Sequence, residues 1–320
     1  MIEVSIICPV FEPNPPLLMA AVRSALDELD AAGMSGEVIL VDDASRTAGT
    51  RAALAHLANP GGRVRLFRSE ANQGPASARN RGIRAARGAW LGFLDADDLW
   101  LPGRLHAMRG LMASPQVKWI GGRHALLLPE SEWQAAPQLG PEGRLGGDGL
   151  TRRLIGNFWM HLGATMLRRE LAMRVEGFGA GLFYGEDVLF VARLSRLAPL
   201  HLLDREVYAW RRAGGGLTGA PARLSATSLR YLEMARHDPL LRDFRRDLRW
   251  ALYSARKGLA INNLRAGRRL AALGFAASAW LSDPREALDF LRFLTLLPGA
   301  NATRRAAYSQ AESFTPEATT

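Results

Sequence analysis

The sequence predicts an α/β protein with a mostly parallel, mixed sheet flanked by helices and a helical extension at the C-terminus. Short apolar runs of strand length alternate with amphipathic runs through the first half of the chain. Most of these apolar runs end in polar or acidic residues, and from Pro221 onward the pattern is helical. Alternation of this kind is typical of a sheet covered by helices on both faces.

Four early apolar runs are the first strand candidates. Amphipathic stretches between them predict helices, one of which has a stripe formed by Leu18, Val22, Ala25 and Leu29. We expect strands at Val4 to Cys8, Glu37 to Val41, Val64 to Arg68 and Ala89 to Leu94, with helices at Ala52 to Leu57 and Ala76 to Ala86.

The later elements define the predicted domains. We expect a strand at Lys118 to Leu128, a long Pro/Gly-rich surface loop at Pro129 to Gly149, a short strand at Gly163 to Arg168, a helix at Glu186 to Leu197 and a strand at His201 to Arg211. The predicted organisation is a main domain over residues 1–219, with halves at about 1–128 and 150–219, then a helical region at 220–310 and a disordered tail at 311–320.

Composition is ordinary for a folded protein, with 320 residues, 48% hydrophobic and 22% charged. The net charge of +10 comes largely from arginines after Arg205, which would suit anionic lipid, glycan or nucleic acid, although a solvated helical face is the commoner explanation. The single Cys8 excludes an internal disulfide and suits a reducing compartment. The chain opens without a secretory signal and carries no spanning segment, so a cytoplasmic location is expected.

Three carboxylates, Asp95, Asp97 and Asp98, follow the fourth predicted strand directly. They should lie at the carboxyl edge of the sheet, where open α/β sheets bind ligands. Oxygen ligands spaced i, i+2 suit Mg²⁺ or Mn²⁺ carrying a diphosphate. A solvated turn that caps a helix is an equal alternative on this segment alone.

Two further clusters follow the second and third strands. Asp42 and Asp43 stand in a turn where an Asp accepts from the imide N–H of a base, or caps the next helix. The segment Asn72 to Gly82 carries Arg79 and Arg81 and either holds phosphate oxygens or simply starts a helix.

A fourth cluster places Glu186 and Asp187 at the start of an apolar helix, after Gly185. Acids favour a helix N-terminus, which is the simple explanation. The functional interpretation is a general base that takes a proton from an incoming hydroxyl.

These motifs together resemble a family 2 glycosyltransferase, an enzyme of GT-A fold. The resemblance covers about two thirds of the chain. It rests on Val-Ser-Ile-Ile-Cys-Pro-Val-Phe at 4–11, Val-Asp-Asp-Ala-Ser at 41–45, Ala-Arg-Asn-Arg-Gly at 78–82, Leu-Asp-Ala-Asp-Asp-Leu-Trp-Leu-Pro at 94–102 and Gly-Glu-Asp at 185–187.

The resemblance implies an inverting transferase that uses a nucleotide sugar, usually a UDP-sugar, with Mn²⁺ or Mg²⁺. Asp43 beside Asp42 would contact the base, Asp95 the ribose and, with Asp97, the metal, and Asp187 beside Glu186 would be the catalytic base. The implied nucleotide-sugar-binding set is Pro9, Phe11, Glu12, Asp42, Asp43, Arg79, Asp95, Ala96 and Arg211.

The chain departs from the family pattern at one position. Arg211 matches an arginine near the diphosphate, but Ala213 stands where a histidine is usual, which implies weaker metal dependence or charge compensation by Arg211 and Arg212. The Gln-x-x-Arg-Trp signature of processive synthases is absent, which favours transfer of one sugar per encounter. Trp159 and His161 fall on the expected acceptor side.

The leading hypothesis is sugar transfer to a hydroxyl of a glycan or lipid-linked acceptor in synthesis of cell-surface polysaccharide. The alternatives are a Mg²⁺-dependent nucleotidyltransferase, or a basic scaffold that binds membrane through its C-terminal helices. Residues 283–297 suit the inner face of a membrane, the catalytic domain or a second copy of the chain. No nucleic-acid partner is expected.

Overall fold

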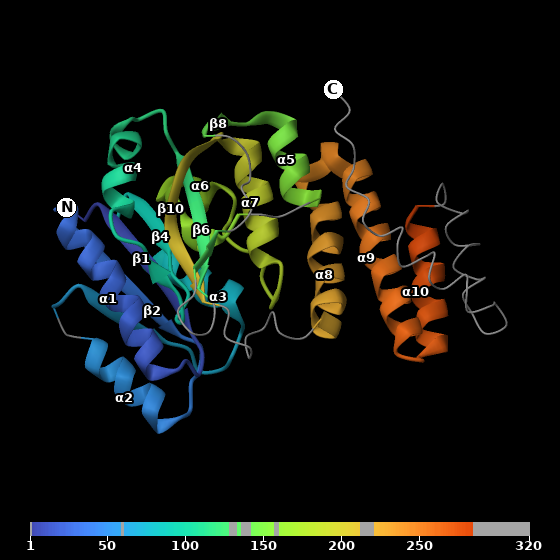
Figure 1. Cartoon of the computed structure of the whole chain (residues 1–320), viewed down its shortest axis with the longest axis horizontal. Helices are drawn as coiled ribbons and strands as arrows, with labels where there is room; N and C mark the ends of the chain where they lie inside the picture. The colour runs from blue at the N-terminus through green and yellow to red at the C-terminus, as the bar shows by residue number, and fades with distance from the viewer. Residues whose placement is uncertain are drawn as a thin grey trace. The chain divides into compact units, whose positions relative to one another are not determined.

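The computed structural model describes residues 2–58, 61–127, 133–135, 142–156, 160–211 and 221–283. The chain divides into two compact units, Met1–Asp247 and Leu248–Thr320. The first unit is built on a sheet flanked by helices (Figure 1). This mixed sheet has ten strands, with the order β3-β2-β1-β4-β9-β6-β10-β5, while β7 pairs with β6 and β8 with β10. The predicted fold class is confirmed.

Four parallel strands form the first half of this sheet. β1 is central, because Val4–Val10 pairs in parallel with β2 on one side and with β4 on the other. The other strands are β2 (Gly36–Asp42), β3 (Val64–Arg68) and β4 (Trp90–Phe93). The carboxyl ends of these strands therefore meet at one edge of the sheet.

The second half of the sheet mixes strand directions. β9 (Thr165–Arg168) runs antiparallel to both β4 and β6 (Trp119–Leu127), and β10 (Leu200–Arg211) runs parallel to β6. Three short antiparallel strands complete the sheet: β5 (Leu99–Trp100), β7 (Trp133–Ala135) and β8 (Gly143–Leu145).

Helices cover both faces of the sheet and enclose two apolar cores. The predicted stripe of α1 is fully buried against β1 and β2, which is why this segment is helical in the fold. The first core lies under α1 (Pro15–Ala31), α2 (Ala48–Leu57) and α4 (Arg104–Ala113). The second lies under α3 (Pro75–Ala85), α5 (Gly147–Gly156), α6 (Arg169–Arg174) and α7 (Glu186–Leu197).

The predicted loop at residues 129–149 is partly wrong. It contains β7, β8 and the first turn of α5. The Pro and Gly content favours a loop locally, but pairing with the distant strands β6 and β10 decides the structure of these short segments. The predicted strand at 163–168 likewise begins with a 3₁₀ turn at Leu162–Ala164.

The helical prediction after Pro221 holds over the described residues. α8 (Pro221–His237) and a 3₁₀ helix at Pro239–Phe244 belong to the first unit. The second unit contains most of α9 (Arg245–Arg265) and all of α10 (Arg269–Ser282), which pack through Ala260, Ile261, Ala272 and Ala276. The functional boundary at residue 219 stays a prediction, and the predicted tail at 311–320 lies outside the described residues.

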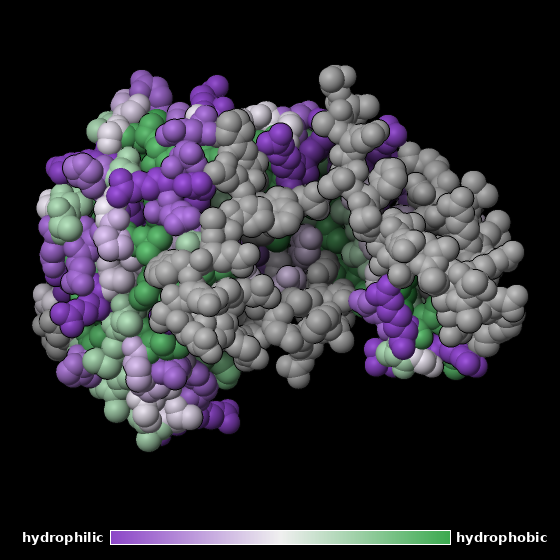
Figure 2. Space-filling model, in the orientation of Figure 1, coloured by the Kyte–Doolittle hydropathy of each residue, from purple (hydrophilic) through white to green (hydrophobic). Residues whose placement is uncertain are grey.

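The described surface is polar over wide areas. On the face shown in Figure 2, hydrophilic residues cover much of the first unit, with apolar residues scattered between them. Within the described part of the chain, every helix is too short or too polar to cross a membrane.

Two buried charged side chains support the carboxyl edge of the sheet. Glu28 of α1 is 5% exposed and accepts hydrogen bonds from the amides of Gly103 and Leu105, at 2.7 and 3.0 Å, so it caps the N-terminus of α4. Arg104 is fully buried over Trp100 and donates to the carbonyls of Gly163, Thr165 and Val207. These contacts fasten α4 to β10 and to the turn before β9.

Glu28→Ala is expected to lower the free energy of unfolding by about 1–3 kcal/mol, because one buried and one partly buried amide at the start of α4 lose their acceptor. Urea denaturation followed by tryptophan fluorescence measures the change. The matched control is the neighbouring Asp27→Ala, whose exposed ion pair with Arg23 contributes at most about 1 kcal/mol. Equal losses in the two variants would contradict the capping role.

Candidate active site at the carboxyl edge of the sheet

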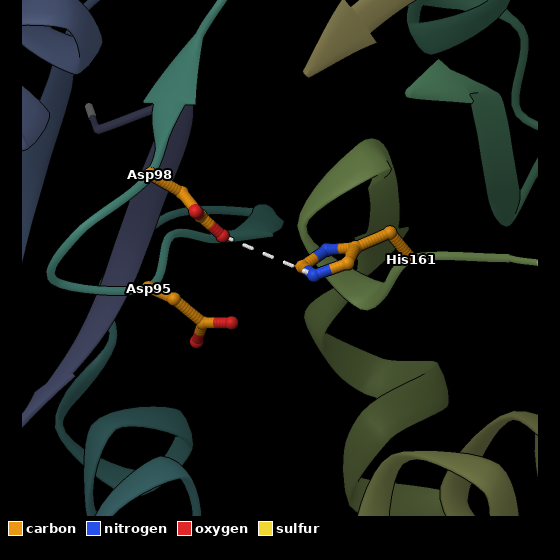
Figure 3. Close-up of side chains that lie close together, drawn as sticks. All are labelled: Asp95, Asp98 and His161. Carbon is orange, nitrogen blue, oxygen red and sulfur yellow. Dashed lines mark ion pairs between the residues drawn. The ribbon is translucent and has the colours of Figure 1, made fainter. Parts of the chain in front are cut away.

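The acidic turn that follows β4 lies at the carboxyl edge of the sheet, and its three carboxylates have different surroundings. Asp98 is 1% exposed, Asp97 is exposed and Asp95 is intermediate. A hydrogen bond of 3.2 Å from the Asp98 amide to the Asp95 carbonyl closes the turn. In Figure 3 the Asp98 carboxylate and the His161 ring point toward one another, with the Asp95 carboxylate beside them.

Arg79 of α3 joins this turn to the start of α7. One terminal nitrogen of its guanidinium donates to Asp95 Oδ1 at 2.8 Å, and the other donates to Glu186 Oε1 at 2.6 Å. Burial acts to raise the pKa of Asp95, but the charge of Arg79 outweighs it, so the pKa is held below its usual value. Arg79 is thus occupied by two carboxylates, and within the described chain its buried Nε has no hydrogen-bond partner.

The two acids that open α7 differ from each other. Glu186 is buried against Arg79, whereas the partly exposed Asp187 accepts only from the adjacent Val188 amide among the hydrogen bonds of the described chain. Burial, followed by the charge of Glu186, raises the pKa of Asp187 to about 7. A carboxylate with this pKa is suited to accept a proton near neutral pH.

The turn after β2 is fastened to the loop before α3. Asp42 is buried and accepts from the Ser45 amide at 2.9 Å and from Arg68 Nε at 2.7 Å. Asp43 accepts from the amides of Gln73 and Gly74 at 3.0 and 2.7 Å. Asp43 therefore lies at the predicted edge, with its carboxylate already bound to backbone donors.

The segment after β1 places Glu12 at the N-terminus of α2. Its carboxylate accepts from the Thr47 hydroxyl at 2.6 Å and from the amides of Arg46 and Thr47. The Thr47 hydroxyl, and then the Arg46 amide, lower the pKa of Glu12. Phe11 is 54% exposed and Pro9 is partly buried at the same edge.

His161 lies against the acidic turn, with Nε2 at 3.9 Å from Asp98 Oδ2. Its Nδ1 accepts from the Gly163 amide at 3.1 Å, so the neutral ring carries its proton on Nε2. Burial lowers the pKa of His161 to about 4, which keeps the ring neutral. His161 therefore presents the N–H of a neutral ring to the acidic turn, at a distance longer than a hydrogen bond, rather than a lone pair for a metal.

The acidic turn fits a hard divalent cation. Ligand atoms of Asp95, Asp98 and His161 lie within 4.8 Å of one another, but the Asp98 oxygens already accept from Tyr208 and Arg211, and His161 carries a proton there. The predicted ligands Asp95 and Asp97 each offer carboxylate oxygens, of the kind that Mg²⁺ and Mn²⁺ prefer, and one Asp95 oxygen accepts from Arg79. Burial and then the charge of Asp95 raise the pKa of Asp97, a repulsion that a cation would relieve.

Arg211 reaches the acidic turn from the end of β10. Its amide donates to Asp98 at 2.7 Å, and its Nε donates to the Asp97 carbonyl at 2.9 Å.

Among the remaining predicted residues, Ala96 is partly buried against the first core. The predicted residues Trp159, Arg212 and Ala213 lie outside the described residues.

Tyr208 also belongs to this site, although no sequence motif indicates it. This residue is fully buried in β10, and its hydroxyl bonds both Asp98 and the amide of Asp95. The available signal was a tyrosine within the short apolar run Val207 to Trp210, which by itself indicates only a buried aromatic residue.

A mixed sheet with this acidic turn after β4, and a carboxylate pair opening α7, has the architecture of the GT-A glycosyltransferases. The sequence model for glycosyl transferase family 2 matches residues 5–173, more than half of the chain, and the chain belongs to this family.

Curated relatives act in bacterial polysaccharide synthesis. The chain is 35% identical over 184 residues to the succinoglycan biosynthesis protein ExoO of Rhizobium meliloti, an alignment that covers 55% of this chain and 51% of ExoO. It is 27% identical over 124 residues to the Escherichia coli UDP-Glc:alpha-D-GlcNAc-diphosphoundecaprenol beta-1,3-glucosyltransferase WfgD, covering 39% of this chain and 46% of that protein. The chain thus spans about half the length of these relatives.

Solved structures share the fold. Residues 1–349 of TarS from S. aureus, in complex with UDP-GlcNAc, align with a TM-score of 0.66 and 16% identity over 97% of this chain and 92% of that one. A mannosyltransferase from Pyrobaculum calidifontis in complex with GDP-Man and Mn²⁺ aligns with a TM-score of 0.57 and 20% identity, covering 98% and 88% of the two chains.

Arg79→Met is expected to lower the free energy of unfolding by about 3–5 kcal/mol, because it leaves the buried Glu186 carboxylate without its cation. Urea denaturation measures the loss. Arg84→Met, on the exposed side of the same helix, is the control and should change stability by no more than about 0.5 kcal/mol. A loss at Arg79 as small as that of the control would contradict the bridging role.

Proposed function

We propose that this protein is an inverting glycosyltransferase that moves a sugar from a nucleotide-sugar donor, most simply a UDP-sugar, to a hydroxyl of a glycan or lipid-linked acceptor. The observation that carries the proposal is the link through Arg79 between the metal-binding acids and the helix that bears Asp187. This link keeps a proton acceptor beside the site where a donor diphosphate would bind. Family membership supports the reaction class.

Asp187 is the proposed catalytic base. With a pKa of about 7 it is ionised in a large fraction of molecules at neutral pH, and it takes the proton from the acceptor hydroxyl as the oxygen attacks the anomeric carbon. The nucleoside diphosphate leaves from the opposite face of the sugar, so one displacement inverts the anomeric configuration. Glu186 holds Arg79 and orients the start of α7 rather than sharing the proton transfer.

Asp95 and Asp97 are the proposed holders of a Mn²⁺ or Mg²⁺ ion, and Asp95 is also the proposed contact to the ribose. A bound cation would offset the charge that develops on the departing diphosphate. Arg211, fixed on the same turn, adds a second positive charge toward this group. Asp43, Phe11 and Pro9 form the proposed side for the base of the nucleotide.

The acceptor is proposed from the relatives. WfgD acts, by its name, on a sugar linked to diphosphoundecaprenol, and ExoO serves succinoglycan synthesis. We extend to this chain a role in cell-surface polysaccharide synthesis, a cytoplasmic location and peripheral contact with the inner face of the membrane through the basic C-terminal helices. Trp159 and His161 are proposed for the acceptor side, and association of two copies is a further proposal.

A screen of UDP- and GDP-sugars by isothermal titration calorimetry with Mn²⁺ tests the donor assignment. At least one donor should bind, and Asp97→Asn should weaken its Mn²⁺-dependent binding by at least about tenfold, because a charged oxygen ligand is lost. Asp204→Asn, at an exposed carboxylate of β10, is the control and should bind like the unaltered protein. Failure of every donor to bind, or normal binding by Asp97→Asn, would exclude the proposed metal and donor site.

Transfer should depend on pH through Asp187. Because the ionised carboxylate is the active form, kcat/KM should fall about tenfold per pH unit below about 7. Asp187→Asn should keep donor affinity and reduce the transfer rate by about 10²–10⁴-fold.

Glu186→Gln should move the acidic limb of the pH profile, where kcat/KM falls, to lower pH. The substitution removes the charge that raises the pKa of Asp187, and it leaves the charge of Arg79 uncompensated. If the acidic limb of the pH profile does not move in Glu186→Gln, Asp187 is not the group whose ionisation produces that limb.

A further inference from the structure

Tyr208 occupies a buried position directly beneath the acidic turn. Its hydroxyl donates to Asp98 Oδ2 at 2.8 Å and accepts from the backbone amide of Asp95 at 3.2 Å. Both partners belong to the turn that carries the proposed metal ligands. One oxygen atom on β10 thus holds the first residue of the turn by its backbone and the last residue by its side chain.

Asp98 extends this attachment to the end of β10. Its second oxygen accepts from the Arg211 amide at 2.7 Å, and Arg211 Nε returns to the Asp97 carbonyl at 2.9 Å. The turn from Asp95 to Asp98 is therefore bound to β10 at four points, and the carboxylate of Asp97 is left facing solvent.

The ring of Tyr208 is itself fixed in place. His161 stacks on it with ring centroids 4.6 Å apart and an interplanar angle of 25°. A Cβ at Gly163 would lie 2.2 Å from the Tyr208 ring, so only glycine permits this approach. Buried Arg104 donates to the carbonyls of Gly163 and Val207, the residue before Tyr208. The ring is therefore held between β10 and the turn that precedes β9.

We propose that Tyr208 and Asp98 are positioning residues, which hold the Asp95 and Asp97 carboxylates in the geometry that binds the divalent cation. This inference rests on the proposed function. Each carboxylate oxygen of Asp98 accepts a hydrogen bond from β10, and Tyr208 is fully buried, so both residues act through the turn. Groups that orient metal ligands typically change metal affinity by about 10–100-fold when they are replaced.

Tyr208→Phe tests the role, because it removes one oxygen and keeps the ring that packs on Gly163 and His161. Mn²⁺ affinity, measured by electron paramagnetic resonance titration in the presence of saturating UDP, should fall by about 10–100-fold. In transfer assays the Mn²⁺ concentration for half-activation should rise, and kcat should largely recover at saturating Mn²⁺. Tyr253→Phe removes the hydroxyl of a buried tyrosine in the second unit and is the matched control with unchanged Mn²⁺ affinity.

Asp98→Asn is the second variant and keeps the volume of the side chain. Since the amide accepts at only one of its two ends, Mn²⁺ affinity should fall as it does in Tyr208→Phe. A loss in Asp98→Asn with unchanged affinity in Tyr208→Phe would make Asp98 a direct ligand and overturn the positioning role. Tyr208→Phe with a lower melting temperature and unchanged Mn²⁺ affinity would also overturn it. Absence of Mn²⁺ binding by the unaltered protein would overturn both this inference and the proposed metal site.

Discussion

The ion pairs of Arg79 with Asp95 and Glu186 are the interaction on which the rest of the site depends. A buried guanidinium between two carboxylates is stable only when both partners are in place, because an unpaired charge is strongly disfavoured in the interior. The acidic turn after β4 and the start of α7 must therefore assemble around α3. This constraint links segments that are about one hundred residues apart in the sequence.

Charge compensation explains why the acids at this edge have different properties. Asp95 lies next to Arg79, which holds its pKa low, whereas partial burial and then the charge of Glu186 raise the pKa of Asp187 to about 7. Burial, followed by repulsion from Asp95 and Asp97, raises the pKa of Asp98, which accepts from Tyr208. Identical side chains thus become suited to metal binding, proton transfer and support of the turn by their surroundings alone.

Several polar groups at the strand ends are used by the fold itself. Glu12 binds the start of α2, Asp42 binds Arg68, and Asp43 binds the loop before α3. These bonds fix the loops that form the edge, since loops without such partners would leave buried polar groups unpaired. The family motif therefore includes residues that shape the site as well as residues suited to touch a ligand.

The alternation of strands and helices, the position of acids at strand ends and the family are predictable from the sequence, because apolar periodicity and short motifs are local properties. The formation of β7 and β8 within a Pro/Gly-rich segment depends on the fold as a whole, since both strands pair with distant strands. The contacts of Arg79 with two carboxylates, and of Tyr208 with the acidic turn, are likewise visible only in the folded structure. Such roles depend on which side chains meet across the fold, and sequence spacing carries no information about those contacts.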